Sequence, residues 1–76
     1  MEKTDIIFGT RAVMEAIRAG KEIEKIMIQS GLANDLIKEL IATARENHVP
    51  YTFVPADKLK KFSAKNHQGV ICILSS

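Results

Sequence analysis

The apolar residues fall into two kinds of segment that alternate along the whole chain. Short runs rich in β-branched and aromatic residues predict strands at residues 6–8, 23–28, 51–54 and 70–74. Between these runs, apolar residues recur with the 3.6-residue period of a helix at residues 11–19 and 32–44, and a shorter helix is expected after Pro55. The sequence therefore predicts four strands that alternate with three helices.

Residues with restricted or left-handed backbone preferences mark where these elements should begin and end. Thr10 can cap the first helix, and Gly20 should terminate it. Asn47 is a natural left-handed terminator for the second helix, and Pro50 should hold Val49 in an extended conformation before the third strand. The third helix is expected to be about two turns long.

The order of elements predicts an α/β fold in the form of a three-layer α/β/α sandwich. Right-handed crossovers between strands would place helices on both faces of a small, largely parallel sheet. The run at residues 70–74 is uniformly apolar, so this strand is expected at the centre of the sheet, covered on both faces. A chain of 76 residues forms one domain, 1–76, and its end directly after this strand suggests a domain edge.

Composition excludes several classes of protein. With 46% hydrophobic and 26% charged residues the chain is an ordinary globular one, and the sequence contains neither a signal peptide nor an apolar run long enough for a bilayer. The single Cys72 cannot form an internal disulfide, and no Cys/His cluster offers a metal site. We therefore expect a soluble protein of the reducing cytoplasm that binds no metal.

No set of residues in the sequence has the spacing of a catalytic or cofactor site. The four glycines lie too far apart for a phosphate-binding loop, which leaves a nucleotide cofactor unsupported. Cys72 lies in an apolar strand that disfavours its thiolate, and His48 follows a helix end, where a solvated loop histidine is the simpler interpretation. The sequence predicts no catalytic residue and no cofactor in this chain.

Positive charge is concentrated near the C-terminus. The net charge is only +2, from 11 Lys and Arg against 9 Asp and Glu, which by itself does not identify a partner. Between residues 58 and 67, however, lysines and a histidine occur without any acidic residue. This segment indicates a local anionic partner.

Two places in the sequence could contact RNA. In the first, lysines would neutralise phosphates, and polar side chains would form hydrogen bonds with bases or riboses. The proposed phosphate contacts are Lys60, Lys61 and Lys65, and the proposed base or ribose contacts are Asn66, His67 and Gln68. Gly69 would let an RNA backbone approach closely. In the second, Arg11 lies at the start of a helix, where unpaired amides attract phosphate. The alternative is a hydrated turn whose lysines only increase solubility, and an Arg11 without a partner.

Two blocks of the sequence are similar to a known family. Residues 8–17, FGTRAVMEAI, resemble the opening block G-x-x-A-V-x-E-A-L of the SpoU/TrmH family of RNA 2′-O-ribose methyltransferases. The helix leading into Val49 and Pro50, and then residues 67–70, HQGV, are similar to the later part of that family's N-terminal substrate-binding domain. The resemblance covers nearly the whole chain, although family members often have His or Pro at the position of Arg11.

This resemblance implies a fold like that of the ribosomal and kink-turn RNA-binding proteins. In such enzymes a separate knotted domain binds S-adenosylmethionine, carries the catalytic arginine and forms the homodimer, so none of these roles is expected of this chain, which would not be an enzyme alone. The implied partner is structured RNA, in particular large-subunit ribosomal RNA that is methylated on a guanosine ribose. The alternatives are a free-standing structural RNA-binding protein and a regulatory or interaction domain that never touches RNA.

Overall fold

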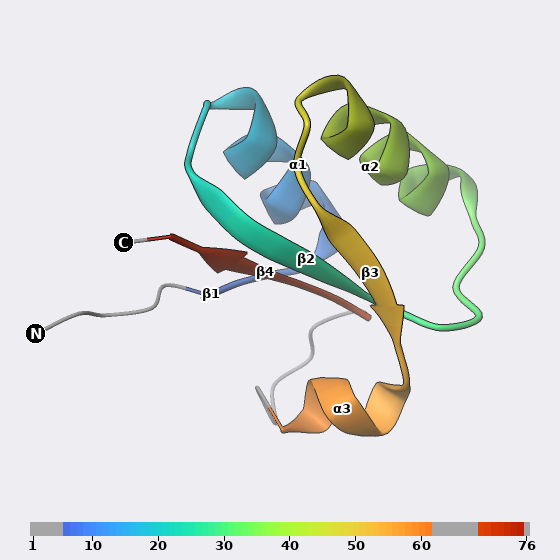
Figure 1. Ribbon diagram of the computed structural model, residues 1–76. Coiled ribbons are helices and arrows are strands. Elements are labelled where there is room, and N and C mark those ends of the chain that lie inside the picture. The colour runs from blue at the N-terminus through green and yellow to red at the C-terminus, as the bar shows by residue number, and fades with distance from the viewer. Residues whose placement is uncertain (1–5, 62–68, 76) are drawn as a thin grey trace, which may run out of the picture.

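The computed structural model describes residues 6–61 and 69–75, which form alternating strands and helices (Figure 1). Along the chain these elements are β1 (Ile6–Phe8), α1 (Thr10–Arg18), β2 (Ile23–Gln29), α2 (Asp35–Glu46), β3 (Tyr51–Val54), α3 (Ala56–Lys60) and β4 (Val70–Leu74). The order predicted from the hydrophobic pattern is confirmed. Within the described residues, no helix is both long enough and apolar enough to cross a membrane.

The four strands form one mixed sheet with the order β1-β4-β2-β3. Only β2 and β3 pair in parallel, whereas β4 runs antiparallel to both of its neighbours, β1 and β2. The prediction of a largely parallel sheet was therefore wrong. The helix between β3 and β4, α3, has only five residues and a length of roughly 8 Å, so it does not itself recross the sheet, and β4 begins at the end where β3 stops.

β4 lies in the interior of the sheet, as its apolar sequence predicted. Val70, Ile71 and Cys72 are completely buried, and Ile73 is 6% exposed. Each face of this strand contributes to a different apolar cluster, because successive side chains point to opposite faces of the sheet. The strand thus connects the two halves of the core.

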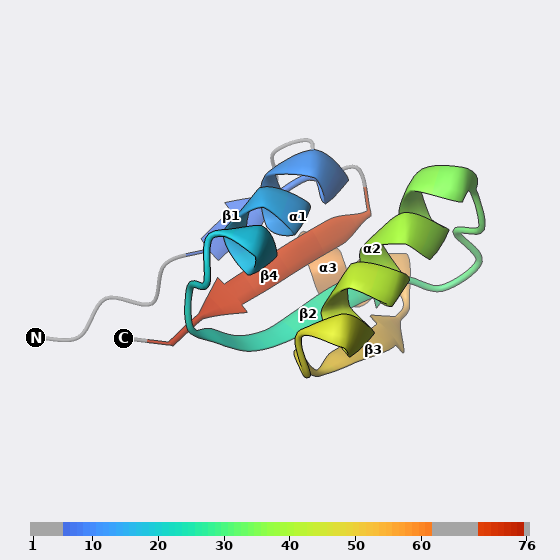
Figure 2. The ribbon, with the colours of Figure 1, turned by 90° about the horizontal axis from the view of Figure 1, so that it is seen from above.

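Helices cover both faces of the sheet, which confirms the three-layer α/β/α architecture. Figure 2 shows α1 and α2 side by side across one face, with α3 behind the sheet. Val13 of α1 and Leu40 of α2 pack with Ile26 of β2 in the larger cluster. On the other face, Leu59 of α3 packs with Met27 of β2 and other apolar residues in the smaller cluster.

The ends of α1 and α2 differ from the prediction by one residue in two places. Gly9, with φ of +92°, holds the cap position of α1, while Thr10 is already helical, buried, and makes no capping bond. At the end of α2 the left-handed residue is His48, with φ of +58°, because the Asn47 amide still donates to the Thr43 carbonyl oxygen, 3.2 Å away, and continues the helical pattern. Gly20 ends α1 as predicted, with φ of +77°.

The start of α2 is fixed by a cap that the hydrophobic period did not reveal. The periodic pattern begins at Leu32, but the helix begins at Asp35. Asn34 precedes it with an extended backbone, and its side-chain oxygen accepts a hydrogen bond of 2.9 Å from the Ile37 amide. This bond satisfies one of the amides that a helix N-terminus leaves unpaired.

Gly69 is a glycine for a reason internal to the fold. Its φ is +80°, and a Cβ built on it would collide with the Leu32 side chain and lie 3.3 Å from the Cβ of Gln29. Its carbonyl oxygen accepts a bond of 2.7 Å from the Gln29 amide. The space beside Gly69, where the sequence predicted the close approach of an RNA backbone, is thus occupied by the Leu32 side chain.

Replacing Gly69 with Ala should destabilise the protein more than the same change at Gly31. Gly31 also has a positive φ, +93°, but a Cβ there would meet nothing within 4 Å. We expect Gly31→Ala to lower the free energy of unfolding by about 1 kcal/mol and Gly69→Ala by about 2–4 kcal/mol, since only the latter adds overpacking to the backbone strain. Urea unfolding measures both values, and equal losses would show that Leu32 does not fill this space.

Candidate nucleic-acid interface

One end of the sheet gathers the chain segments that follow β1, β2 and β3 and the one that precedes β4. The Gly9 amide donates to the Val70 carbonyl oxygen at 3.1 Å, and the Ser30 amide donates to the Val54 carbonyl oxygen at 2.8 Å. Together with the bond between Gln29 and Gly69, these contacts join the segments directly. The start of α1 and all of α3 therefore lie at the same end of the sheet, here called the β4-start end.

The short helix α3 is fixed to the sheet by its apolar side. Pro55 precedes it, and the Lys58 amide donates to the Pro55 carbonyl oxygen at 3.0 Å, which forms the first turn. Leu59 is completely buried in the smaller cluster, beside Val54. Because one side of the helix is anchored in this way, its charged residues must project from the remaining surface.

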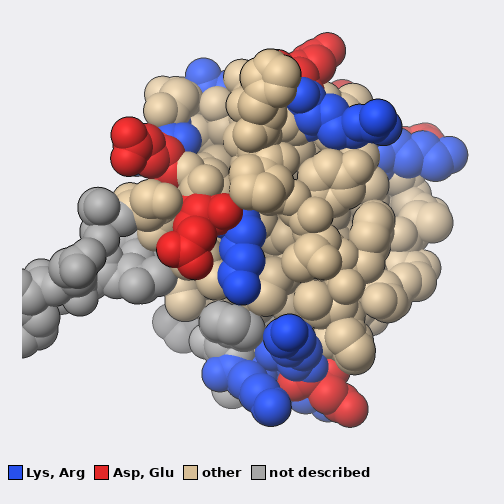
Figure 3. Space-filling model, in the orientation of Figure 1, with Lys and Arg blue, Asp and Glu red and all other residues tan. Residues whose placement is uncertain are grey.

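Three lysines of this segment are exposed, namely Lys58, Lys60 and Lys61. Figure 3 shows blue lysine and arginine atoms gathered over α3, with acidic atoms beside them. Within residues 6–61 and 69–75, none of the three ammonium groups takes part in a salt bridge. Exposed cations that are not held in salt bridges there can attract an anionic partner such as the phosphates of RNA.

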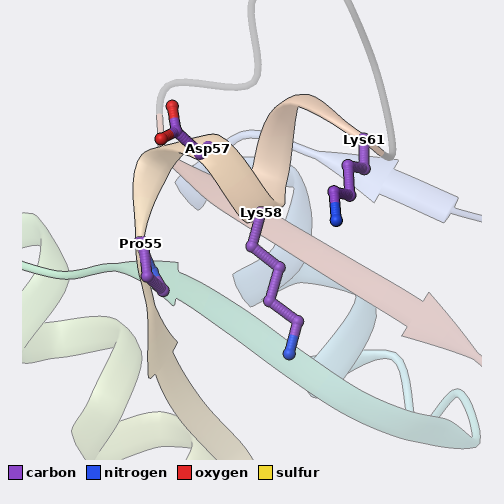
Figure 4. A pocket seen from close by; sticks show the side chains of 4 residues that line it. All are labelled: Pro55, Asp57, Lys58 and Lys61. Carbon is purple, nitrogen blue, oxygen red and sulfur yellow. The ribbon is translucent and has the colours of Figure 1, made fainter.

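Two of these lysines border a hollow of about 630 Å³, which is lined by Pro55, Asp57, Lys58 and Lys61. In Figure 4 the side chains of Lys58 and Lys61 extend from α3 in the same direction, across the face of the sheet. The carboxylate of Asp57 extends the opposite way. Lys60 does not line this hollow.

The structure brings Arg11 to the same end of the sheet as α3, but on the other face. Arg11 is exposed in the first turn of α1, and α1 covers the face opposite α3. It lines a second hollow, of about 380 Å³, together with both acidic and basic residues of α1 and α2, among them Glu15 and Glu39. Arg11 therefore lies in a setting of mixed charge, apart from the lysines of α3.

The remaining predicted contacts, Lys65, Asn66, His67 and Gln68, lie outside the described residues. Their assignment to RNA stays a prediction. Lys58 was not predicted from the sequence as an RNA contact, although it lines the same hollow as Lys61. The signal that could have found it is the three-residue spacing between Lys58 and Lys61, which places two side chains on one side of a helix.

Phe53 is a large aromatic side chain that is not fully buried. It belongs to β3, but its side chain is 48% exposed at the edge of the sheet. The Phe53 ring meets the Tyr51 ring edge to face, with centroids 6.2 Å apart. Part of the Phe53 ring is thus accessible close to the start of α3.

Cys72 has the properties of a core residue. Its thiol is completely buried in β4, and burial raises its pKa to about 11, because removal from water penalises the charged thiolate. Its low thiolate content at neutral pH makes it a poor nucleophile. Among the residues that the structure describes, no three His, Cys, Asp or Glu side chains are grouped as a metal site would require.

Solved structures with the same fold define the class of domain to which this chain belongs. A protein of unknown function from Bacillus halodurans aligns with a TM-score of 0.77 over 93% of this chain and 72% of its own, at 18% identity. An archaeal translation termination factor aligns with a TM-score of 0.66 over 93% of this chain and 20% of its own, at 19% identity. At such identities the likeness shows the fold alone, a small α/β/α sandwich with a mixed sheet.

The family follows from the sequence comparison. Residues 6–76 match the family described as "RNA 2'-O ribose methyltransferase substrate binding". The chain belongs to this family of substrate-binding domains of SpoU/TrmH-type RNA methyltransferases. The resemblance carried by residues 8–17 and 67–70 is thereby confirmed.

Curated relatives contain this domain as one part of a longer chain. A protein of Staphylococcus aureus, named as a candidate TrmH-family tRNA/rRNA methyltransferase, is 37% identical over 75 residues, which are 99% of this chain and 30% of that protein. A protein of the same name from Staphylococcus haemolyticus is 36% identical over 70 residues, 92% of this chain and 28% of that protein. The chain thus spans less than a third of the length of these relatives.

The burial of Cys72 predicts that its thiol is protected in the folded protein. At pH 8 its thiolate fraction is expected to be about a thousandth, and the reagent must also reach a buried strand. We expect labelling by a thiol reagent such as DTNB to be slow in buffer and rapid in concentrated urea, where the thiol recovers its ordinary pKa. Fast labelling of the folded protein would contradict a central, two-sided burial of β4.

Proposed function

We propose that this chain is the RNA-recognition domain of an RNA 2′-O-ribose methyltransferase. It would hold a structured element of large-subunit ribosomal RNA in the cytoplasm while a second domain methylates the ribose of a guanosine. The observation that supports this most directly is the set of lysines on α3, exposed and without salt bridges in the described part of the chain, on a domain of the substrate-binding family. S-adenosylmethionine and a homodimer interface would belong to the second domain.

The proposed contacts divide into two chemical kinds. Lys60, Lys61 and Lys65 neutralise phosphates, which supplies affinity and orients the RNA without reading its sequence. Asn66, His67 and Gln68 bond bases or ribose hydroxyls, which supplies selectivity. Arg11 adds a phosphate contact at the β4-start end, from the face that carries α1. An RNA element that reaches both faces would have to wrap around this end of the sheet.

RNA binding should weaken when the lysines are removed together. In the triple variant Lys60→Ala, Lys61→Ala and Lys65→Ala, the slope of log affinity against log salt concentration should flatten by about 0.7–0.9 for each lost phosphate contact. Filter-binding titrations against transcripts of large-subunit ribosomal RNA, at several salt concentrations, measure both affinity and slope. Circular dichroism serves as the control for folding, because Lys60 and Lys61 are exposed.

The same titration separates this function from its rivals. Unchanged affinity in the triple variant would contradict the assigned surface, and a wild-type protein without salt-dependent RNA binding would contradict the function itself. Competition with small-subunit ribosomal RNA and with tRNA tests the proposed substrate. Equal competition by all three RNAs would contradict a preference for the large subunit.

A further inference from the structure

The three exposed lysines in α3 and directly after it differ in direction, although they form one cluster in the sequence. Residues three apart on a helix lie about 60° apart around its axis, so Lys58 and Lys61 are neighbours, whereas Lys60 points about 100° or more away from both. The structure agrees, because Lys58 and Lys61 line one hollow and Lys60 does not. Figure 4 shows the first two side chains extending in the same direction. They form a pair of ammonium groups.

The hollow beside this pair combines an apolar surface with a charged rim. Pro55 and the methylene stems of the two lysines provide apolar area, while the ammonium groups lie at the ends of the stems. Asp57 also lines the hollow, but its carboxylate extends away from the pair and leaves the two cations unopposed. A ring or sugar against the apolar part, with phosphates at the rim, matches this arrangement.

The apolar part of the hollow favours an unpaired nucleotide over a double helix. The hollow is open to solvent, and Pro55 with the lysine stems can pack against a free base, whereas the bases of a double helix are stacked and paired and present no free face. Bases in single-stranded loops and bulges are free to turn outward, and proteins recognise RNA sequence mainly at such places. The occupant is therefore a nucleotide of a loop or bulge.

The helix that carries the pair is anchored on the sheet by a buried side chain and by backbone hydrogen bonds. Leu59, which lies between the two lysines in sequence, is completely buried, and so anchors the helix on the sheet. The backbone bonds from Lys58 to Pro55 and from Lys61 to Lys58, of 3.0 and 3.3 Å, hold both ends of the turn. Only the lysine side chains need to be ordered on binding, which keeps the entropic cost low.

We infer that the hollow beside α3 binds an unpaired nucleotide of the RNA, with Lys58 and Lys61 on the phosphates that flank it and Pro55 against its base or ribose. This assignment rests on the proposed function and narrows it to one pair of lysines and one structural class of RNA. Lys58 becomes a binding residue beside Lys61, while Lys60 lies outside this hollow.

Two double variants test the assignment with matched loss of charge. Lys58→Ala with Lys61→Ala removes both cations of the hollow, whereas Lys21→Ala with Lys38→Ala removes two exposed lysines outside it. In the protein that carries this chain, with large-subunit ribosomal RNA transcripts as the probe, the first variant should bind about 20-fold more weakly at 0.15 M salt and lose about 1.4–1.8 from the salt slope. The second should lose less than about threefold, the effect of general charge.

The competing RNA reports on the occupant. Single-stranded poly(U) should displace the transcripts from the wild-type protein better than a poly(A)·poly(U) duplex, and this preference should disappear in the first variant. Equal losses of RNA affinity in the two double variants, or equal competition by single strand and duplex, would overturn the inference. The proposed function would still stand as long as the wild-type protein binds RNA in a salt-dependent way. Absence of salt-dependent binding by the wild type would overturn both.

Discussion

The pairing of β4 with two neighbours at once is the interaction on which the rest of this fold depends. In the described part of the chain β1 has no other strand partner, and β2 has only β3 besides. β4 also provides side chains to both apolar clusters, so it is held from above and below as well as from the sides. A strand in this position loses ladder hydrogen bonds and burial together if it is displaced, which makes the fold cooperative despite its small size.

The direction of β4 also determines where a binding surface can form. Because β4 starts at the end of the sheet where β3 stops, α3, which follows β3 directly, lies at the β4-start end. One buried side chain, Leu59, then suffices to fix α3, and the lysines around it stay exposed. A loop-like position on a rigid scaffold is typical of binding residues, since the scaffold supplies the geometry and the surface tolerates charge.

The sequence predicted those features of the fold that depend on local periodicity. The order of the elements, the interior position of β4 and the burial of Cys72 all follow from the spacing and continuity of apolar residues. Strand direction did not follow, because it depends on whether a connection recrosses the sheet, and a helical pattern near Pro55 does not show where the helix ends. Gly69 was misinterpreted for a similar reason, since its close neighbour, Leu32, is distant in sequence.

The candidate site was predictable only as a concentration of charge. The run of lysines from residue 58 onward located the cationic segment. That Lys58 and Lys61 line one hollow while Lys60 does not could be seen only from the helix and the way it is anchored on the sheet. Arg11 lies at the same end of the sheet, on the opposite face. Its position follows from the hydrogen bond between the Gly9 amide and the Val70 carbonyl oxygen, which joins positions far apart in the chain. Such juxtaposition is a property of the folded sheet and not of any motif.

The most direct test of the account is to record amide chemical shifts of the ¹⁵N-labelled protein while large-subunit ribosomal RNA fragments are added. The changes should concentrate at the β4-start end, in α3 and around Gly9 and Val70, whereas the amides of Gly20 and His48, at the other end of the sheet, should stay unchanged. Changes centred on Gly20 and His48, with the amides of α3 unaffected, would contradict the account.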